Sequence, residues 1–223
     1  MIDFKAYIFD LDDTLYCEHD YVKSGFKAVA TELCSQSNYS FSEVYHMLLD
    51  VWKNSGRGQV FDEVCKKINI ETDISYLVDI YRNHVPKIQL YEDALKIIST
   101  LKEKNKNISI ITDGNSHMQW SKIKALRLEE WFDYIVVTGD LGEEYCKPHE
   151  LPYKKTIKKL GLRAEQCVYI GDNPNKDFIT ARKLGMGTVR IIRDVGDHMN
   201  VKLSKDYEAD RVIYSLLELI EDK

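Results

Sequence analysis

Short apolar runs that end in polar residues or glycine recur along the chain, and each has the length of a β-strand. The run at residues 6–9 leads into Asp10, and the run at residues 108–111 leads into Thr112. Three further runs lie at residues 134–137, 167–170 and 188–192. Because these runs are rich in β-branched and aromatic residues, they are typical of strands buried on both faces.

Segments with apolar residues at helical spacing alternate with the later strands. They lie at residues 91–105, 118–128, 152–160 and 177–184. Strands that alternate with helices predict an α/β fold with a parallel sheet flanked by helices. In such sheets a ligand binds outside the carboxyl ends of the strands, so the polar residues that end the runs are candidates for one shared site.

The region between the first and second strands has a different pattern, with no strand-like run. Amphipathic stretches recur there, at residues 21–33, 42–52, 60–68 and 74–84. This pattern predicts an all-helical insert placed directly after the first strand. We therefore expect a helical domain at residues 16–87 and an α/β core made of residues 1–15 and 88–223.

The composition is that of a globular protein, with 44% hydrophobic and 30% charged residues among 223. No block of Lys and Arg stands out, so we expect no nucleic acid partner. The sequence has no basic leader and no apolar run of membrane-spanning length, which predicts a cytoplasmic protein without a membrane partner. Five scattered cysteines without CxxC spacing argue against a zinc site or a disulfide framework.

The segment Asp10-Leu11-Asp12-Asp13-Thr14 directly follows the first predicted strand. Two carboxylates two residues apart can take distinct roles, because one can attack a reacting atom while the other serves as general acid and base. Carboxylates crowded at a strand end also repel one another, and a divalent cation relieves that repulsion. By itself, the segment fits a solvated acidic turn equally well.

Other candidate residues at or near predicted strand ends suit the same chemistry. Asp172 and Asp177 follow a strand and are placed to offer oxygen atoms to a metal ion. Thr112 and Gly114 offer a hydroxyl group and backbone N–H groups to a phosphate oxygen, and Lys147 could neutralise charge on a nucleophile and a phosphate. Each alone fits an ordinary turn or surface loop, but all of them in this order would be a rare coincidence.

As a set, these residues resemble the haloacid dehalogenase-like (HAD) superfamily. Six residues match its four sequence motifs in order: Asp10 and Asp12, then Thr112, then Lys147, and finally Asp172 with Asp177. The resemblance spans about residues 5–195. It implies a Rossmann-like parallel sheet with an inserted helical cap of the C1 type.

The resemblance also implies a role for most of these residues. Asp10 would attack phosphorus to form an aspartyl-phosphate, and Asp12 would protonate the leaving oxygen and then activate water. Mg²⁺ would be held by Asp10, by the backbone carbonyl of Asp12 and by Asp172. Asp177 would contact water or Lys147 instead of the metal ion. A carboxyl group at Asp12 favours phosphoryl transfer over dehalogenation, which needs no acid at that position.

The phosphoryl-binding segment implied by the resemblance is residues 112–114. Thr112 would bind the transferring group, with Asp113 and Gly114 completing the substrate-binding set. Asparagine is common at the position of Asp113 in this motif, so aspartate is a small departure. We expect little effect on the chemistry, because the hydroxyl group and the backbone do the binding there.

Substrate choice belongs to the helical insert, where Arg57 stands between two glycines. A flexible loop with a cation at its tip could bind the leaving group, as a loop of this kind does in C1-capped relatives. It fits a plain connector between two helices equally well.

The function implied by the whole sequence is Mg²⁺-dependent hydrolysis of a small phosphorylated metabolite, either a sugar phosphate or a nucleoside monophosphate. A phosphomutase of the same superfamily is the alternative enzyme. A non-catalytic phosphate-ligand sensor is a further alternative, but it would be expected to lack at least one of the key acids or Lys147. The sequence leaves the oligomeric state open.

Overall fold

The computed structural model describes residues 4–220, so the first three and last three residues of the expected core lie outside it. The chain divides into two compact units, Met1–Glu18 with Ile88–Lys223, and His19–Lys87. Residues 16–18, which we expected in the helical insert, therefore group with the core. Tyr16 explains this grouping, because its backbone forms bridges to Asp12 and to Leu90.

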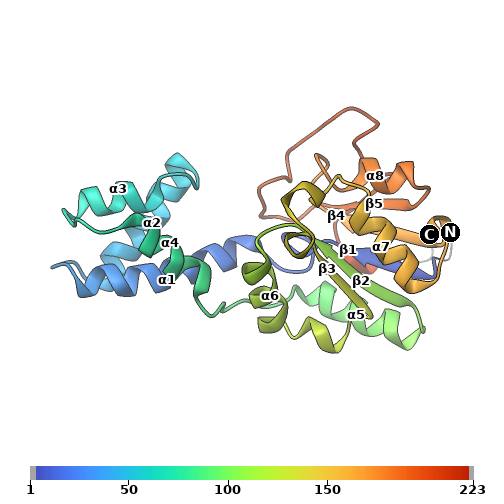
Figure 1. Ribbon diagram of the computed structural model, residues 1–223, viewed down its shortest axis with the longest axis horizontal. Helices are drawn as coiled ribbons and strands as arrows, with labels where there is room; N and C mark the ends of the chain where they lie inside the picture. The colour runs from blue at the N-terminus through green and yellow to red at the C-terminus, as the bar shows by residue number, and fades with distance from the viewer. Residues whose placement is uncertain (1–3, 221–223) are drawn as a thin grey trace. The chain divides into compact units, whose positions relative to one another are not determined.

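The core unit contains a parallel six-stranded sheet, as the sequence predicts (Figure 1). The strand order is β3-β2-β1-β4-β5-β6. The bounds are β1 Ala6–Phe9, β2 Asn107–Thr112, β3 Tyr134–Val137, β4 Cys167–Gly171, β5 Gly187–Ile191 and β6 Arg211–Ile213. Five of these strands match the predicted runs. The sixth was missed because it is a three-residue edge strand in which Val212 is 45% exposed.

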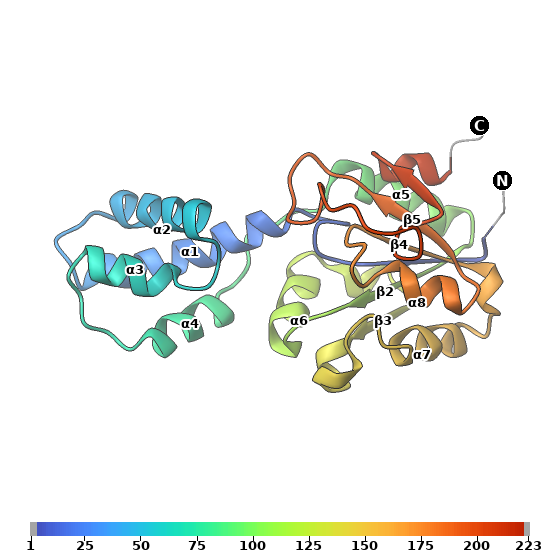
Figure 2. The ribbon, with the colours of Figure 1, turned by 90° about the horizontal axis from the view of Figure 1, so that it is seen from above.

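Helices cover both faces of this sheet, which confirms the predicted fold class (Figure 2). The longer helices are α5 Glu92–Glu103, α6 Ser116–Ala125, α7 Leu151–Leu160 and α8 Phe178–Lys183. On one face, Tyr153 of α7 and Phe178 of α8 pack against Tyr169 of β4. Short 3₁₀ turns lie at Leu128–Glu130, Thr138–Asp140, Glu143–Tyr145, Ala164–Gln166 and Leu216–Leu219.

The second unit is all-helical, as the amphipathic stretches predict. Its helices are α1 Glu18–Ser35, which begins one residue before the unit, α2 Phe41–Ser55, α3 Val60–Lys67 and α4 Ile74–Asn83. Ser40 caps α2 with a reciprocal capping box to Glu43, which satisfies backbone donors at the helix start. The apolar faces meet in a core that includes Leu33, Leu48 and Leu77. No helix within residues 4–220 has the length and apolar character needed to cross a membrane.

Candidate active site

Three neighbouring strands end in the polar residues that the sequence singles out. β1 lies between β2 and β4 in the sheet, and all three run parallel. Asp10 follows β1, Thr112 ends β2 and Asp172 follows β4. Their positions at one edge of the sheet bring these side chains into the same neighbourhood, where α/β sheets bind ligands.

Three buried carboxyl groups form a tight cluster at this edge. Oxygen atoms of Asp10, Asp172 and Asp177 lie within 4.8 Å of one another. Burial raises the pKa of Asp10 to about 6, against the attraction of Lys147. Burial and then the charges of Asp177 and Asp10 hold the pKa of Asp172 well above its ordinary range.

The cluster fits a divalent cation. The Oδ2 atom of Asp172 is buried and has no hydrogen-bond partner among residues 4–220. Both oxygens of Asp177 are bonded, since Oδ1 accepts from Lys147 at 2.8 Å and Oδ2 accepts from the backbone N–H of Asn173 at 3.0 Å. Asp10 and Asp172 are therefore the carboxylates best placed to hold an ion such as Mg²⁺, which prefers oxygen ligands. Asp177 is better placed to orient Lys147.

Lys147 supplies positive charge to this cluster from a fully buried position. Its Nζ atom lies 2.9 Å from Asp10 and 2.8 Å from Asp177, and it donates to the Tyr169 hydroxyl oxygen at 2.9 Å. Burial alone would lower the pKa of Lys147, but the charges of Asp10 and Asp177 outweigh it and raise the pKa well above its ordinary value. Gly171 makes room for this arrangement, because any side chain there would collide with Asp177.

Asp12 lies among three side-chain donors, of which Lys122 and Gln119 could not be identified from the motifs. Lys122 donates to both carboxylate oxygens of Asp12, at 2.8 and 3.0 Å. Gln119 donates to Oδ2 at 2.9 Å, and the Tyr16 hydroxyl donates to Oδ1. Burial would raise the pKa of Asp12, but Lys122 and the other donors lower it below its ordinary value. Asp12 is thus held as a carboxylate.

Lys122 and Gln119 were missed because they stand on the buried side of α6, inside a segment interpreted only as an amphipathic helix. Both side chains are buried. Polar residues three apart on the sheet-facing side of a helix, just after the Thr112 segment, are the pattern that could have identified them.

The side-chain carboxylate of Asp113 is engaged by other residues of the core unit. Its carboxylate accepts from the backbone N–H of Lys147 and from the Thr138 hydroxyl group, both at 3.0 Å. It also pairs with Lys176 at 3.0 Å. Because these contacts hold the carboxylate against the loop that carries Lys147, Asp113 would contact a substrate only through its backbone. Gly114 has a φ of 136°, a conformation that favours glycine.

Arg57 lies in the helical unit, on the exposed connection between α2 and α3. Gly56 before it has a φ of 74°, which favours glycine. A Cβ atom at Gly56 or Gly58 would meet no other atom within 4 Å. Both glycines therefore border open space, and the role of Arg57 in substrate choice stays a prediction.

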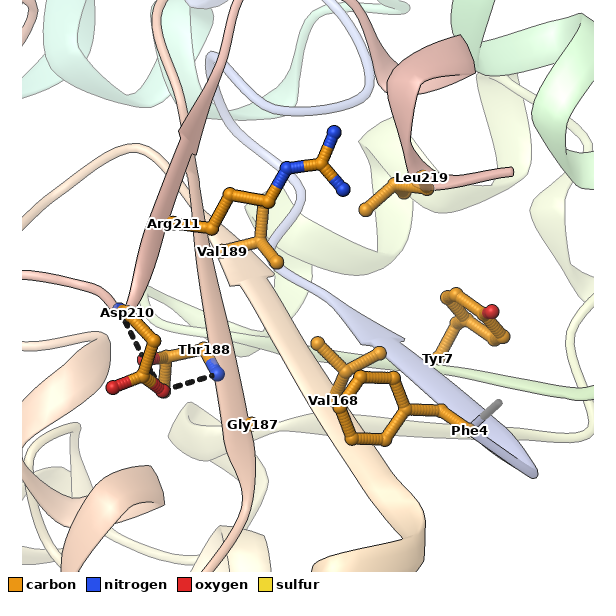
Figure 3. Close-up of a pocket in the computed structure, with 9 residues that line it drawn as sticks. All are labelled: Phe4, Tyr7, Val168, Gly187, Thr188, Val189, Asp210, Arg211 and Leu219. Carbon is orange, nitrogen blue, oxygen red and sulfur yellow. Dashed lines mark hydrogen bonds between the residues drawn. The ribbon is translucent and has the colours of Figure 1, made fainter. Parts of the chain in front are cut away.

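A separate apolar pocket of about 280 Å³ lies near the amino ends of β4, β5 and β6, away from Asp10 (Figure 3). Phe4, Tyr7 and Val168 line one side of it. The polar groups in its wall are already paired, since the Asp210 carboxylate accepts from the backbone N–H and hydroxyl group of Thr188. Arg211 also lines this pocket, and its guanidinium group donates to the backbone carbonyl of Glu218 at 2.9 Å.

Comparisons with known proteins agree with the geometry of the site. A sequence model of a family described as haloacid dehalogenase-like hydrolase matches residues 7–191. The glyceraldehyde 3-phosphate phosphatase of Methanocaldococcus jannaschii is 33% identical, with 97% of this chain and 96% of that protein covered. The ribulose-1,5-bisphosphate 5-phosphatase of Halopiger xanaduensis is 26% identical, with 97% and 98% covered.

A solved structure shares the fold. The magnesium-bound HAD-hydrolase YfnB from Bacillus subtilis matches with a TM-score of 0.66 at 21% identity, with 97% of this chain and 96% of that chain covered. At this identity the likeness concerns the fold alone.

Proposed function

Because this chain belongs to the haloacid dehalogenase-like hydrolases, we propose that it is a Mg²⁺-dependent phosphatase that uses Asp10 as nucleophile. Its class, a phosphoric monoester hydrolase, follows from relatives named as phosphatases along nearly its whole length. The observation that carries the mechanism is the buried cluster of Asp10, Asp172 and Asp177 beside Lys147. A nucleophile, a candidate cation site and a fixed positive charge lie together there.

In the proposed first step, a carboxylate oxygen of Asp10 forms a bond to phosphorus, and the bond from phosphorus to the ester oxygen breaks. Asp12 takes up a proton from solvent before this step, and the ester oxygen keeps the electron pair and takes that proton. In the second step, water bonds to phosphorus and gives a proton to Asp12, while the bond from Asp10 to phosphorus breaks. Asp12 then returns this proton to solvent, so both aspartates are again carboxylates, and inorganic phosphate and the alcohol are the products.

Lys147 and Thr112 support the phosphoryl group in both steps. Lys147 is 2.9 Å from Asp10 and can neutralise charge that develops on the transferring oxygens. The residues that would hold Mg²⁺ are Asp10, Asp172 and the backbone carbonyl of Asp12. A cation bound there supplies charge stabilisation for the phosphoryl group.

The proposed substrate is a small sugar phosphate, in preference to a nucleoside monophosphate. Two relatives along nearly the whole chain are named for phosphorylated sugars, one of three and one of five carbons. These names also favour hydrolysis over the phosphomutase alternative. Arg57 is the proposed selector of the leaving group. The free cysteines of the chain suit an enzyme that works in the reducing cytoplasm.

Phosphate release from glyceraldehyde 3-phosphate tests this proposal. The wild-type protein should release phosphate with Mg²⁺ and lose activity in excess chelator, and restored Mg²⁺ should restore activity. Asp10→Asn should stay folded and release none. Full activity in chelator would overturn the metal site, and substantial activity of Asp10→Asn would overturn the nucleophile.

A further inference from the structure

The carboxylate of Asp12 accepts hydrogen bonds from three side chains at once. Lys122 bonds both of its oxygens, the Tyr16 hydroxyl group bonds Oδ1, and the Gln119 amide bonds Oδ2. A carboxylate has about four lone-pair sites, so all of them are occupied. Contacts to both oxygens fix the plane of the carboxylate as well as its position.

Lys122 and Asp12 differ in burial, and the difference indicates which of the two side chains fixes the other. The Lys122 side chain is 3% exposed, whereas the Asp12 side chain is 22% exposed. Lys122 is thus enclosed in the core unit behind Asp12, while part of Asp12 still faces outward. A buried ammonium group cannot trade its partner for water, so it holds Asp12 more firmly than a surface lysine would.

Gln119 links Asp12 to the residue proposed to bind the phosphoryl group. Its Nε2 atom lies 2.9 Å from Asp12 Oδ2 and 2.6 Å from Thr112 Oγ1. Because a carboxylate only accepts, the Gln119 atom between them must be the donor NH₂ group. Thr112 then accepts from Gln119 and keeps its own hydroxyl hydrogen for a phosphate oxygen.

We propose that Lys122 is the positioning residue of Asp12, which it holds in the plane needed for proton transfer. The inference rests on the proposed phosphatase mechanism and assigns a role that the motif residues do not cover. Oδ2 is the oxygen on the Thr112 side, and Lys122 makes the longer of its two contacts to Oδ2. When that contact opens, Oδ2 is free to take up a proton from solvent, to give it to the leaving oxygen and later to take one from water.

Two phosphate esters separate positioning from general damage. An alkyl ester such as glyceraldehyde 3-phosphate has a poor leaving group that needs an acid, whereas p-nitrophenyl phosphate has a good one that does not. kcat/KM reports events up to leaving-group release, so it reflects the acid step. Hydrolysis of the aspartyl-phosphate needs Asp12 as base with either ester.

The experiment compares Lys122→Met with wild type, with Asp12→Asn as reference and Lys124→Met as control. Lys124 is exposed on the same helix. General acid catalysis contributes about 10²–10⁴-fold, so Lys122→Met should lose roughly 10- to 100-fold in kcat/KM on the alkyl ester. On p-nitrophenyl phosphate its kcat/KM should change by less than about threefold. It should also release a burst of p-nitrophenol close to one per active site, followed by slow turnover.

Equal loss of kcat/KM on both esters, or a burst no larger than that of wild type, would overturn the role of Lys122. If Asp12→Asn itself shows no leaving-group dependence, the proposed acid role of Asp12 fails instead, so the two failures are distinguishable. Should Lys122→Met not fold, Tyr16→Phe removes one donor with little change in volume. It should show the same leaving-group dependence at smaller size, and its absence would count against the proposal.

Discussion

Replacement of Asp172 by asparagine should stabilise the metal-free protein. The carboxyl oxygens of Asp172, Asp10 and Asp177 lie within 4.8 Å of one another. Burial, followed by the charges of the other two groups, raises the pKa of Asp172 well above its ordinary range. A carboxyl group whose pKa is raised by folding opposes folding as the pH rises above its unfolded-state pKa, and the penalty is complete above the folded-state pKa.

The size of the gain follows from the geometry of the cluster. Two unit charges 4.8 Å apart repel by about 3 kcal/mol at an effective dielectric constant of ~20. Proton uptake limits the penalty, because protonating an ordinary carboxyl group at about pH 7 costs about 4 kcal/mol. Asp172→Asn should therefore gain about 2–4 kcal/mol in the free energy of unfolding, which is a rise of roughly 4–16 °C in melting temperature for a chain of this size.

Thermal unfolding in chelator measures the stability of the metal-free protein, and unfolding in excess Mg²⁺ measures how much the ion stabilises it. At a Mg²⁺ concentration 100 times the dissociation constant, the free energy of unfolding of wild type should rise by about 2.7 kcal/mol. That of Asp172→Asn should rise by almost nothing. Asp206→Asn is the control, because Asp206 is exposed on the core unit. Repulsion within the carboxyl cluster is ruled out if metal-free Asp172→Asn melts at or below the temperature of wild type. The metal site is ruled out if Mg²⁺ stabilises Asp172→Asn as much as wild type.

Three other perturbations should have distinct effects. Lys147→Met leaves Asp10 and Asp177 without their buried partner, so chemical denaturation should show a loss of about 3–5 kcal/mol in the free energy of unfolding. Lys154→Met removes only an exposed ion pair and should lower the free energy of unfolding by less than about 1 kcal/mol. The pKa of Asp10 is raised to about 6 and that of Asp172 is raised as well, so Mg²⁺ must displace protons from these ligands at low pH. Calorimetric titration should show the affinity for Mg²⁺ falling as pH drops through about 6, by up to tenfold per unit for each proton displaced, and a flat profile would contradict this. Arg57→Ala should lower kcat/KM for glyceraldehyde 3-phosphate by about tenfold to a few hundredfold but leave kcat/KM for p-nitrophenyl phosphate nearly unchanged. Equal losses on both esters would mean that Arg57 contacts the phosphoryl group or supports the fold. No loss on either ester would mean that the loop only connects two helices.

The sheet and the candidate site were predictable where local chemistry and topology coincide. Asp10, Thr112 and Asp172 each end a buried apolar run, and parallel strands bring such ends to one edge. The helices of the insert were predictable for a similar reason, since their apolar stripes build a core of their own. In these segments, periodicity alone determines the element.

The contacts around the motif residues were not predictable, because they depend on which side of an element faces the site. Lys122 stands in a helical segment like any surface lysine, and only the packing of α6 buries it beside Asp12. Asp113 stands next to Thr112, but its carboxylate points to Lys147 and Lys176 from distant segments. No local pattern encodes pairings across more than 30 residues.

In the proposed mechanism Asp10 carries the phosphoryl group, and trapping of the phosphorylated enzyme is the sharpest test of this role. Wild-type enzyme in excess over ³²P-labelled glyceraldehyde 3-phosphate, with Mg²⁺, is quenched in acid during a single turnover, and the labelled peptide is located by mass spectrometry. We expect transient label on the peptide that contains Asp10 and none on the Asp10→Asn protein. Phosphate release with no labelled protein at any time, or label on another residue, would contradict it.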